Sequence, residues 1–210
     1  MANLTDLTSK EFLTELASAA PAPGGGGGAA MAGALAAALS SMVCNLTLGK
    51  EKFAAQEAEV ESVLVKAERA RERLLELVQE DAAVFNSFMS CYKLPKATEE
   101  EKAARTAAIR AAAKKAAEVP LAIARESFAV LKLADELVVC GNPGVITDGA
   151  CSGLLARAAL RCAEYNVRIN LGLTKDAEWN AQVQAELEAM LTQAEALEAK
   201  LLAVTDKALA

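Results

Sequence analysis

The segment PAPGGGGGAAMAGALAAALSSMV, residues 21–43, is the most informative stretch of the chain. Pro21 and Pro23 restrict the backbone ahead of five consecutive glycines, which leave the following loop without side chains. We expect a helix to begin at Ala29, so that its unpaired N–H groups and the positive end of its dipole face this loop. Such a loop is suited to close contact with a bound molecule or a neighbouring backbone. A flexible linker is the alternative interpretation.

Helical periodicity continues from this segment to both ends of the chain. Apolar residues recur three and four positions apart, and no alternating run typical of a strand is longer than a few residues. The sequence therefore predicts an all-α fold of long helices in a single domain, 1–210. The expected helices cover residues 9–19, 29–48, 51–92, 98–139, 147–171 and 176–207, with a kink at Pro120, a turn at 141–144 and Thr147 or Asp148 as the cap of the fifth.

Two surfaces on these helices need an apolar partner. Small residues four positions apart form a ridge on the second helix, which lets another helix approach closely. The ridge consists of Ala29, Gly33, Ala37 and Ser41. Apolar residues at heptad spacing form a seam along 183–204 in the last helix, and its partner could lie in the same chain or in a second copy.

Composition limits the classes of function. The chain of 210 residues has 53% hydrophobic residues and a formal net charge of −6, which predicts a soluble, mildly acidic globular protein. It has no basic stripe with interleaved aromatic residues, so a nucleic-acid partner is not expected. Residues 29–43 are apolar but short, Ala-rich and interrupted by Ser40 and Ser41, so we expect a buried helix rather than a membrane span.

The cysteines and the N-terminus indicate the compartment. Five cysteines are scattered without the spacing of a disulfide framework or a metal site, so we expect buried, reduced thiols. They are Cys44, Cys91, Cys140, Cys151 and Cys162. The first residues lack the basic and apolar regions of a signal peptide. Together these features predict a cytoplasmic protein.

The chain has no histidine, which restricts its possible chemistry. Proton transfer near neutral pH must then depend on a carboxylate, lysine, cysteine or tyrosine with a shifted pKa, and a metal site with histidine ligands is excluded. Asp81 is the foremost candidate, because it interrupts an apolar stripe between Val78 and Phe85. Partial desolvation on that face would raise the pKa of Asp81 and suit it to proton transfer. A structural ion pair with a facing lysine or arginine is the alternative.

Other polar residues have ordinary interpretations beside functional ones. Residues 142–148 have the composition of a turn and a helix cap, and Lys96 follows a helix end, where solvated charges are common. Asn166 and Asn170 lie four positions apart on one helix face and could bind the edge of a heterocycle or form hydrogen bonds between helices. The glycine block lacks Gly-Lys-Ser/Thr and does not follow a strand, so it is not a phosphate-binding P-loop.

Short motifs along the chain occur in an order typical of one family. They are residues 21–26, 29–34, 42–50, 81–85, 94–96, 119–120, 141–142, 147–148 and 166–170. On these motifs the chain resembles the formiminotetrahydrofolate cyclodeaminase and methenyltetrahydrofolate cyclohydrolase family over nearly its whole length. The resemblance implies a multihelical up-and-down bundle, a homodimer and a tetrahydrofolate site lined by the glycine-rich segment.

The resemblance also implies roles for individual residues. Asp81 is implied as the catalytic residue, and Lys96 as its partner for charge on the intermediate or on the glutamate tail. The implied substrate contacts are Gly25, Gly26, Gly27, Asn142, Asp148 and Asn166. No metal is implied, and no cofactor beyond the tetrahydrofolate substrate. Gly27 stands where members of the family usually have serine, so a hydroxyl contact from that position is lost.

The expected function is that of a methenyltetrahydrofolate cyclohydrolase, interconverting methenyltetrahydrofolate and formyltetrahydrofolate in one-carbon metabolism. In bifunctional relatives the cyclodeaminase works beside a formiminotransferase, and 210 residues of helical pattern leave no room for that second domain. Formiminotetrahydrofolate cyclodeaminase, which releases ammonia, is the first alternative. A non-catalytic helical folate-binding or assembly protein is the second.

Overall fold

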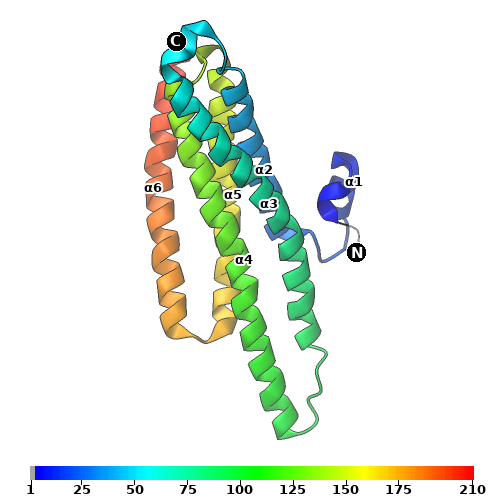
Figure 1. The fold of residues 1–210 in the computed structure, drawn as a ribbon. Helices are drawn as coiled ribbons and strands as arrows, with labels where there is room; N and C mark the ends of the chain where they lie inside the picture. Colours follow the sequence, from blue (N-terminus) through cyan, green and yellow to red (C-terminus); the bar gives the residue numbers. More distant parts are fainter. Residues whose placement is uncertain (1–2) are drawn as a thin grey trace.

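The computed structural model describes residues 3–210, which form six α-helices and three short 3₁₀ turns without a strand. The predicted all-α fold is confirmed. Figure 1 shows the five long helices running up and down in alternation, with the short α1 standing apart from them. The helices are α1 (Ser9–Leu16), α2 (Gly24–Asn45), α3 (Glu57–Cys91), α4 (Glu99–Cys140), α5 (Ile146–Thr174) and α6 (Ala177–Leu209).

Helix α2 packs against α3, α4 and α5, and its small residues let those helices approach its backbone. A Cβ atom on Gly33 would lie 2.9 Å from Ser127 Oγ on α4 and 3.1 Å from Leu74 Cδ2 on α3. All four residues of the predicted small-residue ridge are buried. The ridge is therefore covered inside the chain, and the seam along 183–204 also packs into the core.

Helix α2 begins at Gly24 rather than at Ala29, so the glycines form its first turns instead of a loop. Pro23 occupies the N-cap with helical dihedral angles, and no side chain caps the helix. Glycine is accommodated because neighbouring atoms fill the space that side chains would need. A Cβ on Gly27, for example, would lie 2.9 Å from Pro23 Cβ. The linker interpretation is thus wrong, and the N–H groups at the start of α2 still lack intrahelical partners.

The other helix boundaries lie closer to the predicted ones than the start of α2 does. The helix expected over 51–92 divides into a 3₁₀ turn (Glu51–Gln56) and α3. Helix α4 continues through Pro120 without a break. The N-terminal helix ends at Leu16, short of the expected residue 19.

The start of α5 also differs from the prediction. Neither Thr147 nor Asp148 caps it, because the helix already begins at Ile146 and has no side-chain cap. Asn142 instead caps the preceding 3₁₀ turn, Pro143–Val145. Asn142 therefore stabilises a turn one step earlier in the chain.

Within residues 3–210, α2 is the helix whose length and hydropathy would allow it to cross a membrane. Of its most apolar window, 61% is buried inside the structure. The burial follows from its contacts with three neighbouring helices. A core helix passes the same test of length and hydropathy, and the predicted buried helix at 29–43 lies within α2.

The cysteines form no disulfide among the described residues, but not all of them are buried. Cys44 and Cys140 are buried, Cys91 is half-buried, and Cys151 and Cys162 are exposed. The expectation of buried thiols is thus wrong for both cysteines of α5. The helix stripe that carries them points away from the core, and periodicity alone does not distinguish this stripe from a buried one.

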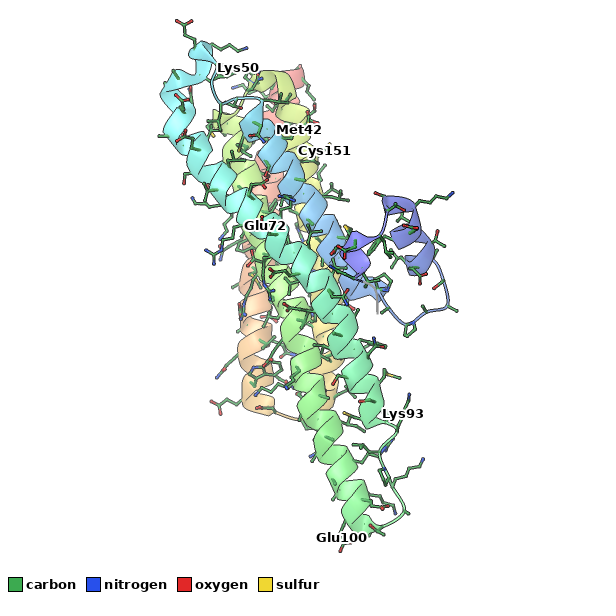
Figure 2. All side chains as sticks on the ribbon, turned by 45° about the vertical axis from the view of Figure 1, so that its right-hand side comes forward. Met42, Lys50, Glu72, Lys93, Glu100 and Cys151 are labelled. Atoms are coloured by element: carbon green, nitrogen blue, oxygen red, sulfur yellow. The ribbon has the colours of Figure 1, made fainter. Side chains whose placement is uncertain are left out.

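An exposed apolar surface, here called the α2–α5 face, runs along the outer sides of these two neighbouring helices. It consists of Leu35 and Met42 on α2 and Leu154, Tyr165 and Ile169 on α5, which are between 41% and 72% exposed. Figure 2 labels Met42 and Cys151 on the same side of the bundle. No residue of α2 carries a charge, so charged groups do not interrupt the surface on that helix. Apolar surfaces of this kind usually mark an interaction site.

Candidate active site

A cavity of about 300 Å³ opens where the first turn of α2 meets α3, α4 and α5. Its volume is at the lower end of the range for small-molecule sites. Among the described residues that line it, Asp81 alone is charged. Residues 3–210 contain no group of three or more Cys, Asp or Glu side chains placed to hold a metal ion. Of the predicted site residues, the cavity wall contains Gly25, Gly26, Asp81 and Asn166.

The carboxylate of Asp81 lies directly against the first turn of α2. A Cβ atom on Gly26 would overlap both carboxylate oxygens and lie 2.6 Å from Asp81 Cγ. The Gly27 N–H donates a hydrogen bond to this carboxylate, and its nitrogen is also 3.1 Å from Pro23 O. The positive end of the α2 dipole thus faces Asp81. Contact between this side chain and the helix requires glycine at position 26.

The environment of Asp81 changes its acidity. Burial raises the pKa of Asp81 to about 6, and the hydrogen bond from the Gly27 N–H opposes the rise. Within residues 3–210, no lysine or arginine forms an ion pair with Asp81, so the alternative of a structural ion pair is wrong. A carboxyl group that titrates near pH 6 can both donate and accept a proton close to neutrality.

Asn166 on α5 faces the first turn of α2. Its Nδ2 is 3.4 Å from the position that a Cβ on Gly25 would occupy, and it donates a hydrogen bond to Cys162 O at 2.9 Å. One N–H and the Oδ1 of this amide are left for a bound molecule. Phe85 and Phe88 on α3 add apolar wall to the same cavity.

Lys96 does not reach this cavity within one chain. It is exposed in the connection between α3 and α4 and does not belong to the cavity wall. Figure 2 labels Lys93 near the start of that connection and Glu100 in the first turn of α4, at the far tip of the two helices. Lys96 is separated from the cavity because both α3 and α4 continue well past the start of α2.

Asn142 and Asp148 lie at the other end of α2. Asn142 Nδ2 donates to Leu46 O at 3.0 Å, and its Oδ1 accepts from the Gly144 N–H at 3.0 Å. This amide therefore fastens the end of α2 to the turn before α5. Asp148 lies in the first turn of α5 at the same end of the bundle. Within one chain the predicted site residues thus lie in three places: at the cavity, in the segment before and at the start of α5, and, for Lys96, in the connection between α3 and α4.

Several residues of the cavity wall were not proposed from the sequence. Phe88 and Ile169 follow the same helical periodicity as core residues, which hides their position in a cavity. Pro120 carries a clearer signal, because a proline inside a helix leaves one carbonyl without its usual donor. Asn170, which completes this part of the wall, was considered only together with Asn166.

Asp81→Asn should make the protein more stable at neutral pH. The pKa of Asp81 is higher in the folded chain than in the unfolded one, so folding loses stability as the pH rises from about 4 through 6. The neutral amide keeps an acceptor for the Gly27 N–H and removes that loss. We expect a gain of about 2 kcal/mol at pH 7.5 that disappears near pH 4. Denaturant unfolding at both pH values measures it, and a variant less stable than wild type at pH 7.5 would contradict the burial of this charge.

Comparison with known proteins places this chain in a family. Residues 8–189 match the sequence profile of the family described as Formiminotransferase-cyclodeaminase. A methenyltetrahydrofolate cyclohydrolase of Methylorubrum extorquens is 45% identical over 190 residues, covering 90% of this chain and 91% of that protein. A formimidoyltransferase-cyclodeaminase of Sus scrofa is 33% identical over 185 residues, covering 88% of this chain but 34% of that protein.

The fold agrees with a solved structure. The crystal structure of a formiminotetrahydrofolate cyclodeaminase from Thermotoga maritima superposes with a TM-score of 0.88 at 28% identity, covering 99% of this chain and 100% of that one. The chain therefore corresponds to nearly the whole of two bacterial proteins and to about a third of the Sus scrofa protein. With its helical bundle and its matching sequence, this chain belongs to the formiminotransferase-cyclodeaminase family.

Proposed function

We propose that this chain is a methenyltetrahydrofolate cyclohydrolase. The observation that carries the proposal is the half-buried carboxyl group of Asp81, which is the charged side chain among the described residues of the cavity wall and whose pKa burial raises to about 6. A relative with 45% identity over 91% of its own length is named for this activity. A purely structural carboxylate would be expected to have a cationic partner, and Asp81 has none within residues 3–210. This disfavours a non-catalytic binding or assembly protein.

One carboxyl group suffices for the reaction. Water adds to the electrophilic carbon between two nitrogens of methenyltetrahydrofolate, and Asp81 accepts a proton from that water. The bond from this carbon to one nitrogen then breaks, and Asp81 returns its proton to the departing nitrogen. The remaining hydroxyl proton leaves to solvent as the formyl C=O bond forms. Asp81 ends in its starting state, ready for the next turnover.

The charge of the substrate suits this cavity. The methenyl group is part of a cationic amidinium, and Asp81 is the charged residue among the described residues of the wall. Attraction between the two is stronger in a partly buried site than in water. A bound cation also lowers the pKa of Asp81, which keeps the carboxylate deprotonated before water is attacked.

Formiminotetrahydrofolate cyclodeaminase is the second candidate, favoured by the Thermotoga maritima structure with that activity in its description. There a nitrogen of the substrate attacks the formimino carbon and ammonia departs, so the same carboxyl group could transfer the protons. The higher identity to the Methylorubrum extorquens protein, 45% against 28%, favours the cyclohydrolase.

We also propose a homodimer that pairs through the α2–α5 face. Ile169 and Leu173 line the cavity yet are 72% and 39% exposed, so a second copy on this face would cover the cavity mouth. A two-fold axis across the middle of the face would bring the 142–148 segment of one copy to the cavity of the other. Asn142 and Asp148 could then contribute to the folate site, as the family resemblance implies.

Lys96, exposed on the connection between α3 and α4, remains our candidate for the anionic glutamate tail. The unpaired cysteines suit the reducing cytoplasm, which we propose as the location of the protein.

Asp81→Asn should lower kcat for hydrolysis of methenyltetrahydrofolate about a thousandfold, because an amide cannot exchange a proton. Loss of the near-ultraviolet absorbance of the substrate, corrected for the enzyme-free rate, measures it.

For the wild type, kcat/KM should rise with pH through about 6, as the base form of Asp81 appears. Activity of the variant within tenfold of wild type would remove Asp81 from the mechanism. If ammonia release from formiminotetrahydrofolate has the higher kcat/KM, the second candidate is correct.

Gly26→Ala should abolish most of the activity, whereas Gly28→Ala should not. The added methyl group at position 26 would displace the carboxylate of Asp81, but at position 28 its nearest neighbour is Leu16 Cδ2 at 3.9 Å. Both changes replace a glycine near the start of the same helix, so Gly28→Ala controls for backbone effects and should stabilise α2 slightly. We expect a loss of about a hundredfold in kcat for Gly26→Ala. Equal activity of the two variants would show that contact with Asp81 is unimportant.

Leu35→Glu should produce a monomer with little activity. The charge would lie at the centre of the α2–α5 face, where Leu35 is 55% exposed in one chain. Val65→Glu is the matched control, because Val65 is 70% exposed on α3, outside that face. Sedimentation at micromolar concentration should find a dimer for wild type and Val65→Glu. A monomeric, fully active wild type would refute the proposed pairing.

A further inference from the structure

Pro120 lies inside α4 and is buried next to the cavity. In an uninterrupted helix, the N–H of residue 120 would donate to the carbonyl oxygen of Ala116. Proline has no N–H, so this carbonyl is left without its helical donor. Asn170 on the neighbouring helix α5 takes the place of that donor, with Nδ2 2.9 Å from Ala116 O.

The same nitrogen makes a second contact that fixes the orientation of the amide. Asn170 Nδ2 also donates to Asn166 O at 2.9 Å, so both of its hydrogens are used by backbone carbonyls. Exchanging the nitrogen and oxygen of the amide would place Oδ1 against two carbonyl oxygens, which repel it. The orientation of Asn170 therefore follows from its partners.

This arrangement leaves one polar atom available. Asn170 Oδ1 has no donor within residues 3–210, and the half-buried side chain belongs to the cavity wall. It is an acceptor held in a fixed position, in the same cavity as Asp81 and with no hydrogen left to donate. A molecule that satisfies it must present an N–H or O–H group.

We propose that Asn170 is a specificity-determining residue whose Oδ1 accepts a hydrogen bond from an N–H of the substrate's reduced pterin ring, and that Pro120 positions it. The proposal rests on the proposed function. The pterin ring carries amino and amide N–H donors, whereas the cationic methenyl carbon carries none. The contact therefore holds the ring while Asp81 acts at the reacting carbon. Because it is the same before and during the reaction, its loss should raise KM more than it lowers kcat.

Substitutions at both positions separate binding from structure. Asn170→Ala removes the acceptor but also leaves Ala116 O without a donor, so its effect alone is ambiguous. Pro120→Ala restores the helical N–H for that carbonyl and should raise Tm, while Asn170 loses one of its two anchors. In the double variant Ala116 O is satisfied by the helix, and the variant differs from Pro120→Ala by the missing Oδ1 and by the side-chain hydrogen bond to Asn166 O, a carbonyl that lies inside α5 and keeps its helical donor.

The experiment measures kcat and KM for methenyltetrahydrofolate, and affinity for 5-formyltetrahydrofolate as a non-reacting probe. We expect KM and the probe Kd to rise about tenfold for Asn170→Ala and about threefold for Pro120→Ala. The double variant should match Asn170→Ala, with kcat within threefold of wild type throughout.

Each other outcome overturns part or all of the proposal. A double variant with wild-type KM would show that Asn170 serves only the carbonyl of α4. If the factors by which KM rises in the two single variants multiply in the double variant, the two residues act independently, and Pro120 does not position Asn170. Unchanged KM in Asn170→Ala, in a protein where Asp81→Asn is inactive, would refute the contact and leave the proposed function intact. Failure of the wild type to turn over or bind either folate would refute both.

Discussion

Residues with little or no side chain let α3 and α4 pack against the backbone of α2, and both the core and the cavity depend on this contact. At Gly33 the backbone of α2 meets Leu74 on α3 and the hydroxyl group of Ser127 on α4, and this contact closes the bundle. At Gly26, two turns earlier, the group that approaches the backbone is the carboxylate of Asp81. A larger side chain at either position would require the helices to separate. The stability of the bundle and the geometry of the site therefore have a common physical basis.

The site departs from what stability alone would favour. A carboxylate in a half-buried position without a cationic partner is unfavourable, and the hydrogen bond from Gly27 compensates only in part. Pro120 in the middle of α4 and the glycines at the start of α2 are poor helix formers as well. All of these features meet at one cavity, as is common where local rules of folding give way to function.

The sequence predicted the fold where periodicity is strong and failed where tertiary contacts override local propensity. The long helices and Asp81 follow from apolar spacing, because a charged residue within such a stripe is conspicuous. The start of α2 was missed because glycine has a low intrinsic helix propensity. Here glycine is needed in the first turns, because Asp81 and Pro23 occupy the space that side chains at positions 26 and 27 would need.

The contact between Ala116 and Asn170 joins residues far apart in the chain, and no local pattern indicates it. Exposure of Cys151 and Cys162 was missed for a similar reason, since an apolar stripe looks the same whether it faces the core or the outside. Local spacing thus singled out Asp81 and placed Asn166 and Asn170 on one helix face, but the hydrogen bond between Asn170 and Ala116 needed the three-dimensional structure.

The solitary charge of Asp81 also has a consequence for the end of the catalytic cycle. In the cyclohydrolase reaction the ring system that enters is cationic, and the formyl product that leaves is neutral at the same carbon. Because the described cavity wall contains no other charged side chain, the electrostatic attraction that holds the substrate ends when the ring opens. In the proposed reaction, the chemical step thereby weakens the hold on its own product.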